Sequence, residues 1–379
     1  MTPTTQKALL VVSKGANFVL ATRPVPKPGP RQVLIKVESV ALNPLDWAVT
    51  TRGLLMKSFP SVGGSDGAGT IEGLGEGATG VQKGDRVLFQ CLDYTSDRGA
   101  FQQYAIADAH RISKIPSNLS FDEAATVPLG LATAAVGLYA PKAPMGGAAL
   151  TPPWVEGGKD KYKDQPALVT GGSSSVGQFG EVTCSLMSHK APTHIQSLNS
   201  PAIQLLKLSG FNPIISTSSA RNFDYVRVAG ATHVIDYHTT PYASLRAAVE
   251  KITSAPIPVI YDAISSEDSQ RACWDILAPN GAIVVTTGMR QPVVGKPGED
   301  AEDGKHLARV YGSVDIVKDV EFGNQLHASL TGLLESGALK PNKVEILSNG
   351  LAGVLDGVAR FGRGEVSGVK LVAHVDATP

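Results

Sequence analysis

The chain has 379 residues, of which 42% are hydrophobic and 18% are charged. This length predicts two domains, and the hydrophobic share is large enough for a packed core, which excludes a globally disordered chain. The 34 Lys and Arg residues balance the 34 Asp and Glu residues, so we predict neither a nucleic-acid-binding protein nor a polybasic membrane-surface protein.

The number of cysteines and the lengths of the apolar runs indicate where in the cell the protein is expected. Three cysteines, Cys91, Cys184 and Cys273, are too few for a disulfide framework or a four-thiolate zinc lobe. The first residues lack the pattern of a signal peptide, and no run reaches the roughly 18 uncharged apolar residues of a membrane span. We therefore expect a cytoplasmic protein in a reducing environment, with no membrane partner.

Residues 1–127 carry the pattern of short β-strands. Runs such as KALLVV and QVLIKVESVAL alternate with Gly and Pro turns, and eight glycines fall between Gly63 and Gly80. This density favours the corners of a small barrel, with a β-sandwich as the alternative.

Residues 128–313 alternate apolar strands with helical segments, and residues 140–166 form an exposed Pro-, Gly- and Lys-rich excursion. Unbroken apolar strands separated by helices predict a doubly wound parallel sheet covered on both faces. Beyond them, residues 314–379 contain a predicted helix over Val320–Gly337 and a terminal strand within VKLVAHV. The predicted strands are Ala167–Thr170, Pro213–Thr217, His233–Asp236, Val259–Asp262, Ala282–Thr287 and Arg309–Ser313.

The first of these strands runs into a Gly- and Ser-rich turn, ALVTGGSSSVGQF. A turn of this kind between a strand and a helix is the usual site for a dinucleotide pyrophosphate. The fingerprint glycines align with Gly172, Ser174 and Gly177, so the middle glycine is replaced by a serine whose hydroxyl can donate to phosphate. The alternative is a turn that binds nothing.

An anomalous stretch follows this turn. Residues 180–201 contain two prolines and two histidines without a helical period. When the stretch is removed, Val176, Phe179, Ala202, Leu205 and Leu206 fall on one helical face. We interpret the stretch as an unspliced intron or a recent insertion; the alternative is a family-specific flap over the site. Its Cys184, His189 and His194 do not predict a metal site.

The next strand indicates the type of coenzyme. A carboxylate at its end usually binds the ribose 2′-hydroxyl of NAD, but here the strand ends in Ser218, Ser219 and Arg221. Hydroxyls beside a guanidinium suit a 2′-phosphate, which favours NADPH. The alternative is that these side chains cap the following helix.

The order of motifs along the chain resembles the zinc-independent branch of the medium-chain dehydrogenase/reductase superfamily. The motifs are LNPLDW, PSVGGSDGAGTI, GDRV, PLGLATAAVGL, VTGGSSSVGQ, GATHVIDY and SGVKLV. The most similar group holds quinone-oxidoreductase-like proteins and the fungal trans-acting enoyl reductases of polyketide pathways. The resemblance implies a GroES-like catalytic domain over 1–127, a Rossmann domain over 128–313, and a segment 314–379 that returns to the catalytic domain, with a cleft between the domains.

The resemblance also implies the absence of catalytic zinc. Zinc-using relatives carry Cys where this chain has Asn43, and Gly-His-Glu where it has Gly64-Ser65-Asp66. Members of the group often carry Lys where this chain has Ala48, so any help that this Lys gives in orienting coenzyme or substrate is missing.

The resemblance implies a role for several matched positions. The pyrophosphate would be faced by Ser173, Ser174, Ser175 and Val176, and the 2′-phosphate by Ser218, Ser219 and Arg221. Tyr237 would lie by the adenosine, and the residues near the nicotinamide would be Asp46, Trp47 and Thr133. The substrate side would be lined by Thr286, Thr287, Gly288 and Met289, and the coenzyme would be covered by Val366 and Ser367. Trp47, Thr133 and Tyr237 also have purely structural interpretations, as core, helix and strand-end residues.

We therefore predict an NADPH-dependent oxidoreductase that reduces a polarised C=C bond or a quinone by hydride transfer. The sequence offers no convincing general acid, and water is then the proton source. The alternatives are a zinc-type alcohol or carbonyl dehydrogenase, a catalytically weak NADPH-binding accessory protein, and a chain that folds poorly. The expected partners are a small-molecule substrate, a polyketide synthase or other biosynthetic protein, and for a homodimer a second copy of the chain.

Overall fold

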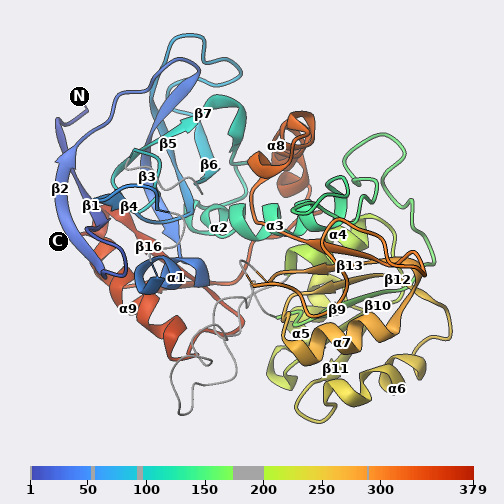
Figure 1. Ribbon diagram of the computed structural model, residues 1–379. Helices are drawn as coiled ribbons and strands as arrows, with labels where there is room; N and C mark the ends of the chain where they lie inside the picture. Colours follow the sequence, from blue (N-terminus) through green and yellow to red (C-terminus); the bar gives the residue numbers. More distant parts are fainter. Residues whose placement is uncertain (1, 53–55, 92–96, 174–199, 288–289) are drawn as a thin grey trace. The chain divides into compact units, whose positions relative to one another are not determined.

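The computed structural model describes residues 2–52, 56–91, 97–173, 200–287 and 290–379 (Figure 1). The chain forms two compact units. Unit 1 comprises Met1–Leu129, His327–Gly337 and Pro341–Pro379, and unit 2 comprises Gly130–Leu326 and Ala338–Lys340. The sequence-based boundaries lay at 127/128 and 313/314. In the described part of the chain no helix is long and apolar enough to cross a membrane.

Unit 1 is built around the long strand β3 (Gln32–Ala41), most of whose residues are buried. β3 pairs antiparallel with β5 (Asp66–Leu74), β7 (Tyr104–Asp108) and β16 (Lys370–His374). A Cβ atom on Gly69 of β5 would lie 2.1 Å from the Lys36 carbonyl oxygen, so only glycine permits this approach of the two backbones. The glycine-rich stretch thus lets β5 lie against the centre of the sheet.

The strands of unit 1 form two sheets, one of seven strands with β7 paired to β3, and one of three strands in the order β2-β1-β4. Its strands are β1 (Thr5–Val11), β2 (Phe18–Pro24), β3, β4 (Ser61–Val62), β5, β6 (Arg86–Gln90), β7, β8 (Ile112–Lys114), β15 (Val344–Leu347) and β16; its helices are α1 (Pro44–Arg52), η1 (Ala109–Arg111), α2 (Phe121–Ala125), α9 (Leu351–Gly362) and η6 (Val375–Ala377).

Unit 2 contains the predicted parallel sheet, with six strands in the order β11-β10-β9-β12-β13-β14. All five neighbouring pairs are parallel. Helix α4 packs beside α5, and α6 packs beside α7. Since each half of the sheet is connected by right-handed crossovers, the two helix pairs cover opposite faces. The predicted doubly wound α/β fold class is confirmed.

The strands of unit 2 are β9 (Ala167–Thr170), β10 (Ile214–Ser218), β11 (His233–Asp236), β12 (Ile257–Asp262), β13 (Leu277–Val285) and β14 (His306–Arg309); its helices are α4 (Ser200–Leu208), η3 (Ala220–Asn222), α5 (Phe223–Ala229), η4 (Tyr242–Ser244), α6 (Leu245–Glu250), α7 (Glu267–Ile276) and η5 (Val314–Ile316). Two helices cross the boundaries between the units, α3 (Pro128–Tyr139) and α8 (Val320–Glu335).

One predicted strand is misplaced. The prediction put the last strand at Arg309–Ser313, whereas β14 spans His306–Arg309. β13 ends at Val285, which pairs with Arg309 and accepts a hydrogen bond from the Val310 amide at 3.0 Å, so the paired segment ends there. The predicted helix from Val320 and the terminal strand are both present, and the terminal strand β16 joins β3 of unit 1.

Candidate functional site

The site begins where the order of the parallel strands reverses. β9 lies between β10 and β12: the chain continues from β9 to β10 and β11 on one side and then crosses to β12, β13 and β14 on the other side. In doubly wound sheets the carboxyl ends of the strands on either side of this point form the usual ligand crevice. The segments that follow β9, β10, β11, β12 and β13 therefore define the candidate site in unit 2.

The turn after β9 is held by the neighbouring strand. Gly171 has a φ of +64°, and its amide donates to the Thr217 hydroxyl at 2.9 Å. The Gly172 amide donates to the Thr217 carbonyl at 2.8 Å, and a Cβ atom on Gly172 would lie 2.1 Å from Ser216 Oγ. Glycine is thus required here for close packing of the turn on β10. Both amides are bonded within the protein, so neither is available as a donor to a phosphate.

The structure brings together two residues predicted for different phosphates. Ser218 Oγ, at the end of β10, donates to Ser173 Oγ at 2.9 Å, and both side chains are buried. The next predicted residues of the turn, Ser174, Ser175, Val176 and Gly177, lie outside the described residues, as does nearly all of the anomalous stretch 180–201. Gly172 and Ser173 are therefore the part of the fingerprint that has a described geometry.

The segment after β10 gathers the groups predicted for the 2′-phosphate. Ser219 is buried, Arg221 is exposed on η3, and the half-buried Tyr237 follows β11. Burial raises the pKa of the Tyr237 phenol, while a hydrogen bond with Ser219 and the charge of Arg221 oppose that rise. From Ile214 to Asn222 the sequence contains no Asp or Glu. Hydroxyl groups, a phenol and a guanidinium fit a phosphate better than a ribose diol.

A buried carboxylate that the sequence analysis did not single out connects the ends of two neighbouring strands. Asp262 at the end of β12 accepts hydrogen bonds from Thr170 Oγ1 at 2.5 Å, the Ser265 amide at 2.9 Å and Ser269 Oγ at 2.8 Å. Burial raises the pKa of Asp262, and these donors oppose the rise. The group thus ties the end of β9 to the turn after β12.

The same turn holds the end of β13. Ser265 Oγ accepts from the Thr286 amide at 2.7 Å, and the Thr286 hydroxyl, which is fully buried, donates to the Ala263 carbonyl at 3.2 Å. Thr287 is also buried, but its Oγ1 has no hydrogen-bond partner among the described residues. Of the residues predicted for the substrate side, Thr287 therefore has an uncommitted hydroxyl, Thr286 does not, and Gly288 and Met289 lie outside the described residues.

The remaining predicted residue of unit 2 is Thr133. It lies in α3 and is 3% exposed. This burial is compatible with the interpretation of Thr133 as an ordinary helix residue. Its role near the nicotinamide stays a prediction.

Two of the predicted residues of unit 1, Asp46 and Trp47, lie in the first turns of α1. Asp46 is fully buried, its Oδ2 accepts from the Asn43 amide at 2.7 Å, and its Oδ1 has no partner among the described residues. Burial raises the pKa of Asp46 to about 8. At neutral pH this side chain therefore holds a proton.

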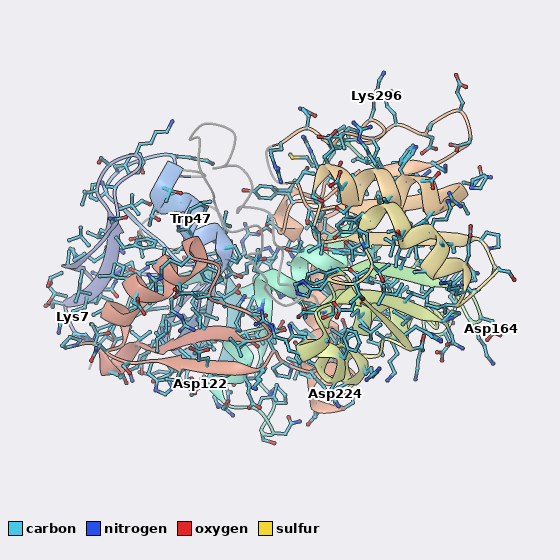
Figure 2. The ribbon with its side chains drawn as sticks, turned by 90° about the horizontal axis from the view of Figure 1, so that it is seen from below. Lys7, Trp47, Asp122, Asp164, Asp224 and Lys296 are labelled. Atoms are coloured by element: carbon cyan, nitrogen blue, oxygen red, sulfur yellow. The ribbon has the colours of Figure 1, made fainter. Side chains whose placement is uncertain are left out.

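Trp47 lies on α1 (Figure 2) and packs against α9, because a Cβ atom on Gly362 would lie 2.7 Å from Trp47 Nε1. The helix contact accounts for Trp47 as a packing residue, and its predicted coenzyme contact stays a prediction. Val366 is 1% exposed and precedes β16, as does the partly buried Ser367.

Two buried side chains of opposite charge, Lys370 and Asp66, lie close to Asn43, the residue before α1. Lys370 Nζ is 3.2 Å from Asp66 Oδ2, and it also donates to Asn43 Oδ1. Lys370 was missed in the sequence because a lysine within an apolar strand usually faces solvent. Among the described residues no group of three or more His, Cys, Asp or Glu side chains could hold a metal ion.

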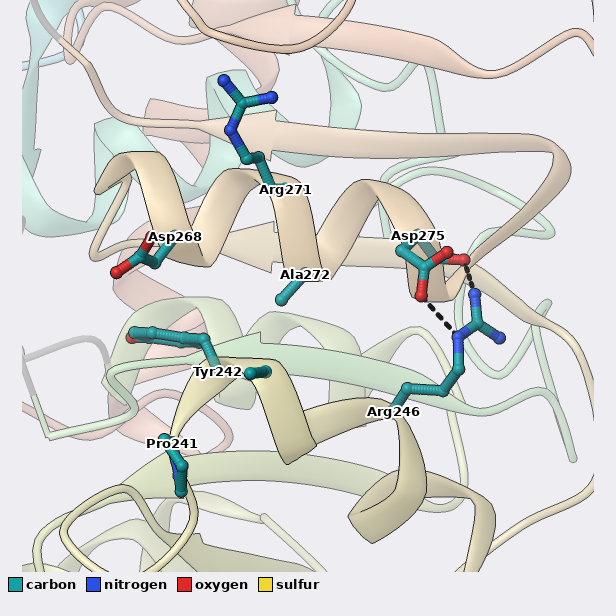
Figure 3. A pocket seen from close by; sticks show the side chains of 8 residues that line it. Pro241, Tyr242, Arg246, Asp268, Arg271, Ala272 and Asp275 are labelled. Atoms are coloured by element: carbon teal, nitrogen blue, oxygen red, sulfur yellow. Dashed lines mark hydrogen bonds and ion pairs between the residues drawn. The ribbon is translucent and has the colours of Figure 1, made fainter.

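A separate polar pocket lies away from these groups. Its volume is about 370 Å³ and it is lined by residues of η4, α6 and α7 (Figure 3). Arg246 Nε donates to Asp275 Oδ2 at 2.5 Å across it. None of the residues predicted for coenzyme or substrate lines this pocket; its lining residues are Pro241, Tyr242, Ala243, Arg246, Asp268, Arg271, Ala272 and Asp275.

Comparison with known proteins identifies two family matches. Residues 29–117 match the alcohol dehydrogenase GroES-like domain family, and residues 200–314 match the zinc-binding dehydrogenase family. The second match begins at the first residue of α4. Both matches agree with the β-rich unit and the parallel-sheet unit described above.

Full-length relatives are similar to the whole chain. A trans-enoyl reductase of Penicillium citrinum is 31% identical over 98% of both chains. The enoyl reductase component of the lovastatin nonaketide synthase of Aspergillus terreus is 27% identical, over 99% of this chain and 97% of the relative.

Solved structures have the same fold. The quinone oxidoreductase of Coxiella burnetii has a TM-score of 0.68 at 21% identity and covers 97% of this chain and 98% of its own. The crotonyl-CoA carboxylase/reductase AntE, solved in complex with NADP, has a TM-score of 0.72 at 16% identity, with coverage of 100% and 96%.

Proposed function

This chain belongs to the medium-chain dehydrogenase/reductase superfamily, in the group of the fungal trans-enoyl reductases, and from that premise we propose that it reduces the C=C bond of an enoyl thioester with NADPH. The chain is an oxidoreductase that uses a nicotinamide coenzyme. The choice of NADPH, the thioester and the independence from zinc are the parts that we propose.

The observation that carries the proposal is the end of β10. Ser218, Ser219 and Arg221 stand where an NAD site has a carboxylate, and Tyr237 adds a phenol beside them. A carboxylate would repel a 2′-phosphate, whereas a guanidinium forms charge-assisted hydrogen bonds with it. The donor set therefore fits NADPH. The close packing of Gly172 on β10 agrees, because it holds the turn against the strand that carries these donors.

In the proposed reaction the coenzyme supplies a hydride to the β-carbon of the conjugated thioester. The residues of the chain orient the reactants and stabilise charge. Ser173 would contact the pyrophosphate, and Arg221 would hold the 2′-phosphate. The uncommitted Thr287 hydroxyl is the described group best suited to donate a hydrogen bond to the developing enolate oxygen. We assign protonation of the α-carbon to water.

We propose that the hydrogen bonds around Asp262 hold the residues of this site in fixed positions. It joins the end of β9, which carries the phosphate turn, to the turn that fixes Thr286. Thr287 follows Thr286 directly, so its position depends on the same bonds. A donor held in place before the reaction stabilises developing charge without the cost of reorganisation.

The proposed substrate is delivered by a partner. The Aspergillus terreus relative is described as a component of a nonaketide synthase, so we propose that this chain also acts on a thioester carried by a polyketide synthase. A free thioester then serves as a simplified substrate that lacks the partner contacts and has a raised KM.

The test is an NADPH oxidation assay with crotonyl-CoA and a longer enoyl thioester, with a simple quinone and an alcohol as comparison substrates. We expect the absorbance of NADPH to fall only when the enoyl thioester is present, and we expect a saturated thioester as the product. Coenzyme binding without turnover of any acceptor would instead support the accessory-protein alternative.

A second experiment separates coenzyme choice from catalysis. Arg221→Ala should raise the KM for NADPH by about 10-fold or more, since a charge-assisted contact is worth about 1.5–3 kcal/mol. The KM for NADH should stay unchanged. The control is Arg227→Ala, which removes an exposed arginine of α5 that pairs with Asp224 and should alter neither constant. Equal effects of the two variants would contradict the assignment of the 2′-phosphate.

A further inference from the structure

A buried ammonium group occupies the core beneath the start of α1. Lys370 is 2% exposed, yet its Nζ carries a positive charge into unit 1. It lies 3.2 Å from Asp66 Oδ2 and donates to Asn43 Oδ1. A buried charge is tolerated only with a partner and hydrogen bonds, and Lys370 has both.

The partners of Lys370 are themselves bonded to neighbouring elements. Asn43 Nδ2 donates to Asp66 Oδ2 at 3.0 Å, and the Leu129 amide donates to Asp66 Oδ1 at 2.8 Å. Asn43 stands just before α1, and Leu129 is the last residue of the first segment of unit 1. The ammonium of β16 is therefore the centre of a set of bonds that fixes the start of α1 and the end of that segment.

One matched family is described as zinc-binding, but its match covers residues 200–314 and therefore includes none of Asn43, Asp66 and Lys370. Structural zinc sites use Cys and His donors, and catalytic zinc sites combine such donors with a carboxylate, whereas the described side chains bonded to Lys370 are Asn43 and Asp66. The oxygen atoms of Asn43 and Asp66 that a cation would use already accept from the ammonium. A second cation beside Lys370 would be repelled at a separation of a few ångströms.

We propose that the ammonium of Lys370 takes the place of a metal ion between Asn43 and Asp66, so that the chain carries its own cation and the position is closed to divalent metals. Lys370 is a positioning residue in this proposal: it acts by holding Asn43 and Asp66, and through them the start of α1. The proposal is independent of the coenzyme and of the substrate.

The first experiment compares metal content and thermal stability. The purified wild-type protein should contain less than a stoichiometric amount of metal, and neither EDTA nor added Zn²⁺ or Mn²⁺ should raise or lower its Tm. Lys370→Ala should lower the Tm by more than about 5 °C, because it leaves the Asp66 carboxylate buried without its charge partner.

The same variant should respond to a metal ion. With the ammonium removed, the oxygen atoms of Asn43, Asp46 and Asp66 offer the donors that hard cations prefer. Saturating Mn²⁺ should therefore raise the Tm of Lys370→Ala, since binding to the native state stabilises it by mass action. Lys370→Ala combined with Asp66→Asn should lose that response.

The matched control is Lys36→Ala. Lys36 also belongs to unit 1 and pairs with Glu38 and Asp376, but it is partly exposed. This variant should show no response to Mn²⁺. Stoichiometric metal in the wild-type protein that EDTA removes with a fall in Tm would overturn the proposal, as would a folded Lys370→Ala variant whose Tm does not respond to Mn²⁺.

If Lys370→Ala yields no folded protein, Lys370→Met and the pair Lys370→Met with Asp66→Asn decide the matter. The pair removes both charges, so it should yield more folded protein and a higher Tm than Lys370→Met alone. A pair that is no better than the single variant means that Lys370 does not balance Asp66, and the proposal fails.

Discussion

Asp46 shows how one buried carboxyl group makes stability depend on pH. Burial raises its pKa to about 8 in the folded protein, opposed by the hydrogen bond from the Asn43 amide, whereas an unfolded Asp loses its proton near pH 4. Between these values the native state holds a proton that the unfolded state has released. The free energy of unfolding must therefore fall as the pH rises from about 4 to about 8.

Asp46→Asn should remove this dependence. The amide imitates the neutral carboxyl, and its oxygen can accept from the Asn43 amide. We expect the free energy of unfolding of the wild-type protein to fall by about 1 kcal/mol per pH unit between pH 5.5 and 7.5 on account of this group. Urea unfolding at several pH values should show a flatter profile for Asp46→Asn. Asp224→Asn, at an exposed ion pair, should keep the wild-type slope, and a common slope for all three proteins would contradict the assignment.

The hydrogen bond between Thr170 and Asp262 leads to a second prediction. Its hydroxyl donates to the fully buried Asp262 carboxyl. Thr170→Val keeps the shape and removes the donor, so it should lower the free energy of unfolding by about 1.5–3 kcal/mol, the range for bonds to charged groups.

The control for this prediction is Thr50→Val. Thr50 is also buried, but its hydroxyl donates to the Trp47 carbonyl of its own helix. Its replacement should cost about 1 kcal/mol or less, since the acceptor is neutral. If both valines cost the same in urea unfolding, the hydrogen bond to Asp262 carries no special weight.

Some of these residues could be singled out from the sequence alone, and others could not. Ser218, Ser219 and Arg221 could be singled out from the sequence because residue types at one strand end indicate a coenzyme preference, and their role at a 2′-phosphate stays a prediction. Asp262 and Lys370 could not, because their importance lies in partners that are distant in sequence: Asp262 bonds to Thr170, and Lys370 pairs with Asp66. An Asp at the end of an apolar strand and a Lys within one are weak signals until the fold supplies those partners.

At the scale of elements, the packing of α4 and α5 on the sheet depends on Gly172. A Cβ atom at this position would lie 2.1 Å from Ser216 Oγ, 3.0 Å from Ile203 Cδ1 and 3.1 Å from Val226 Cγ1. Ile203 belongs to α4, Val226 to α5 and Ser216 to β10. Gly172→Ala therefore has to displace either the phosphate turn or the strand beside it.

We expect Gly172→Ala to lower the free energy of unfolding by about 1–3 kcal/mol, the range for overpacking, and to weaken NADPH binding. Gly332→Ala in α8 is the matched control, because a Cβ atom there meets nothing within 4 Å. It should be neutral or stabilise by up to about 1 kcal/mol. Thermal unfolding with and without NADPH measures both effects, and a Gly172→Ala variant that melts and binds like Gly332→Ala would disprove the packing argument.

Element types were easier to predict than element ends. The strands at Ala167–Thr170 and His233–Asp236 agree with β9 and β11 because Gly, Pro and polar residues bound these apolar runs. β14 was misplaced because Arg309–Ser313 is also rich in β-formers, and only its pairing with β13 decides where the strand lies. The choice between barrel and sandwich for unit 1 likewise depends on pairings, such as that of β3 with β16, that join opposite ends of the chain.

At the scale of the whole molecule, unit 1 is assembled from segments far apart in the sequence. β16 completes the sheet by pairing antiparallel with β3 and parallel with β15. The parallel sheet of unit 2, by contrast, is made entirely within residues 130–326. An insertion between β9 and β10 therefore falls within the continuous part of the chain that forms unit 2, and no strand of unit 1 lies in that part.

The sequence predicts that the stretch 180–201 is such an insertion. The zinc-binding dehydrogenase family match begins at residue 200, where α4 also begins, and α4 buries Ala202, Leu205 and Leu206 completely. A phosphate site of this fold uses a helix that starts at the turn itself, and in the sequence residues 178–199 separate Gly177 from Ser200, the first residue of α4. Removal of 180–201 joins Phe179 to Ala202 and continues the apolar face of α4 back to Val176.

We therefore expect a chain without residues 180–201 to be more stable and to bind NADPH more tightly. At a coenzyme concentration of a hundred times Kd, binding stabilises the native state by about 2.7 kcal/mol, which thermal unfolding detects as a rise in Tm. The shortened chain should show this rise at lower NADPH concentration than the full chain, and NADH should produce a smaller one. A shortened chain that folds but has lost its response to NADPH would show that the stretch is a working part of the site.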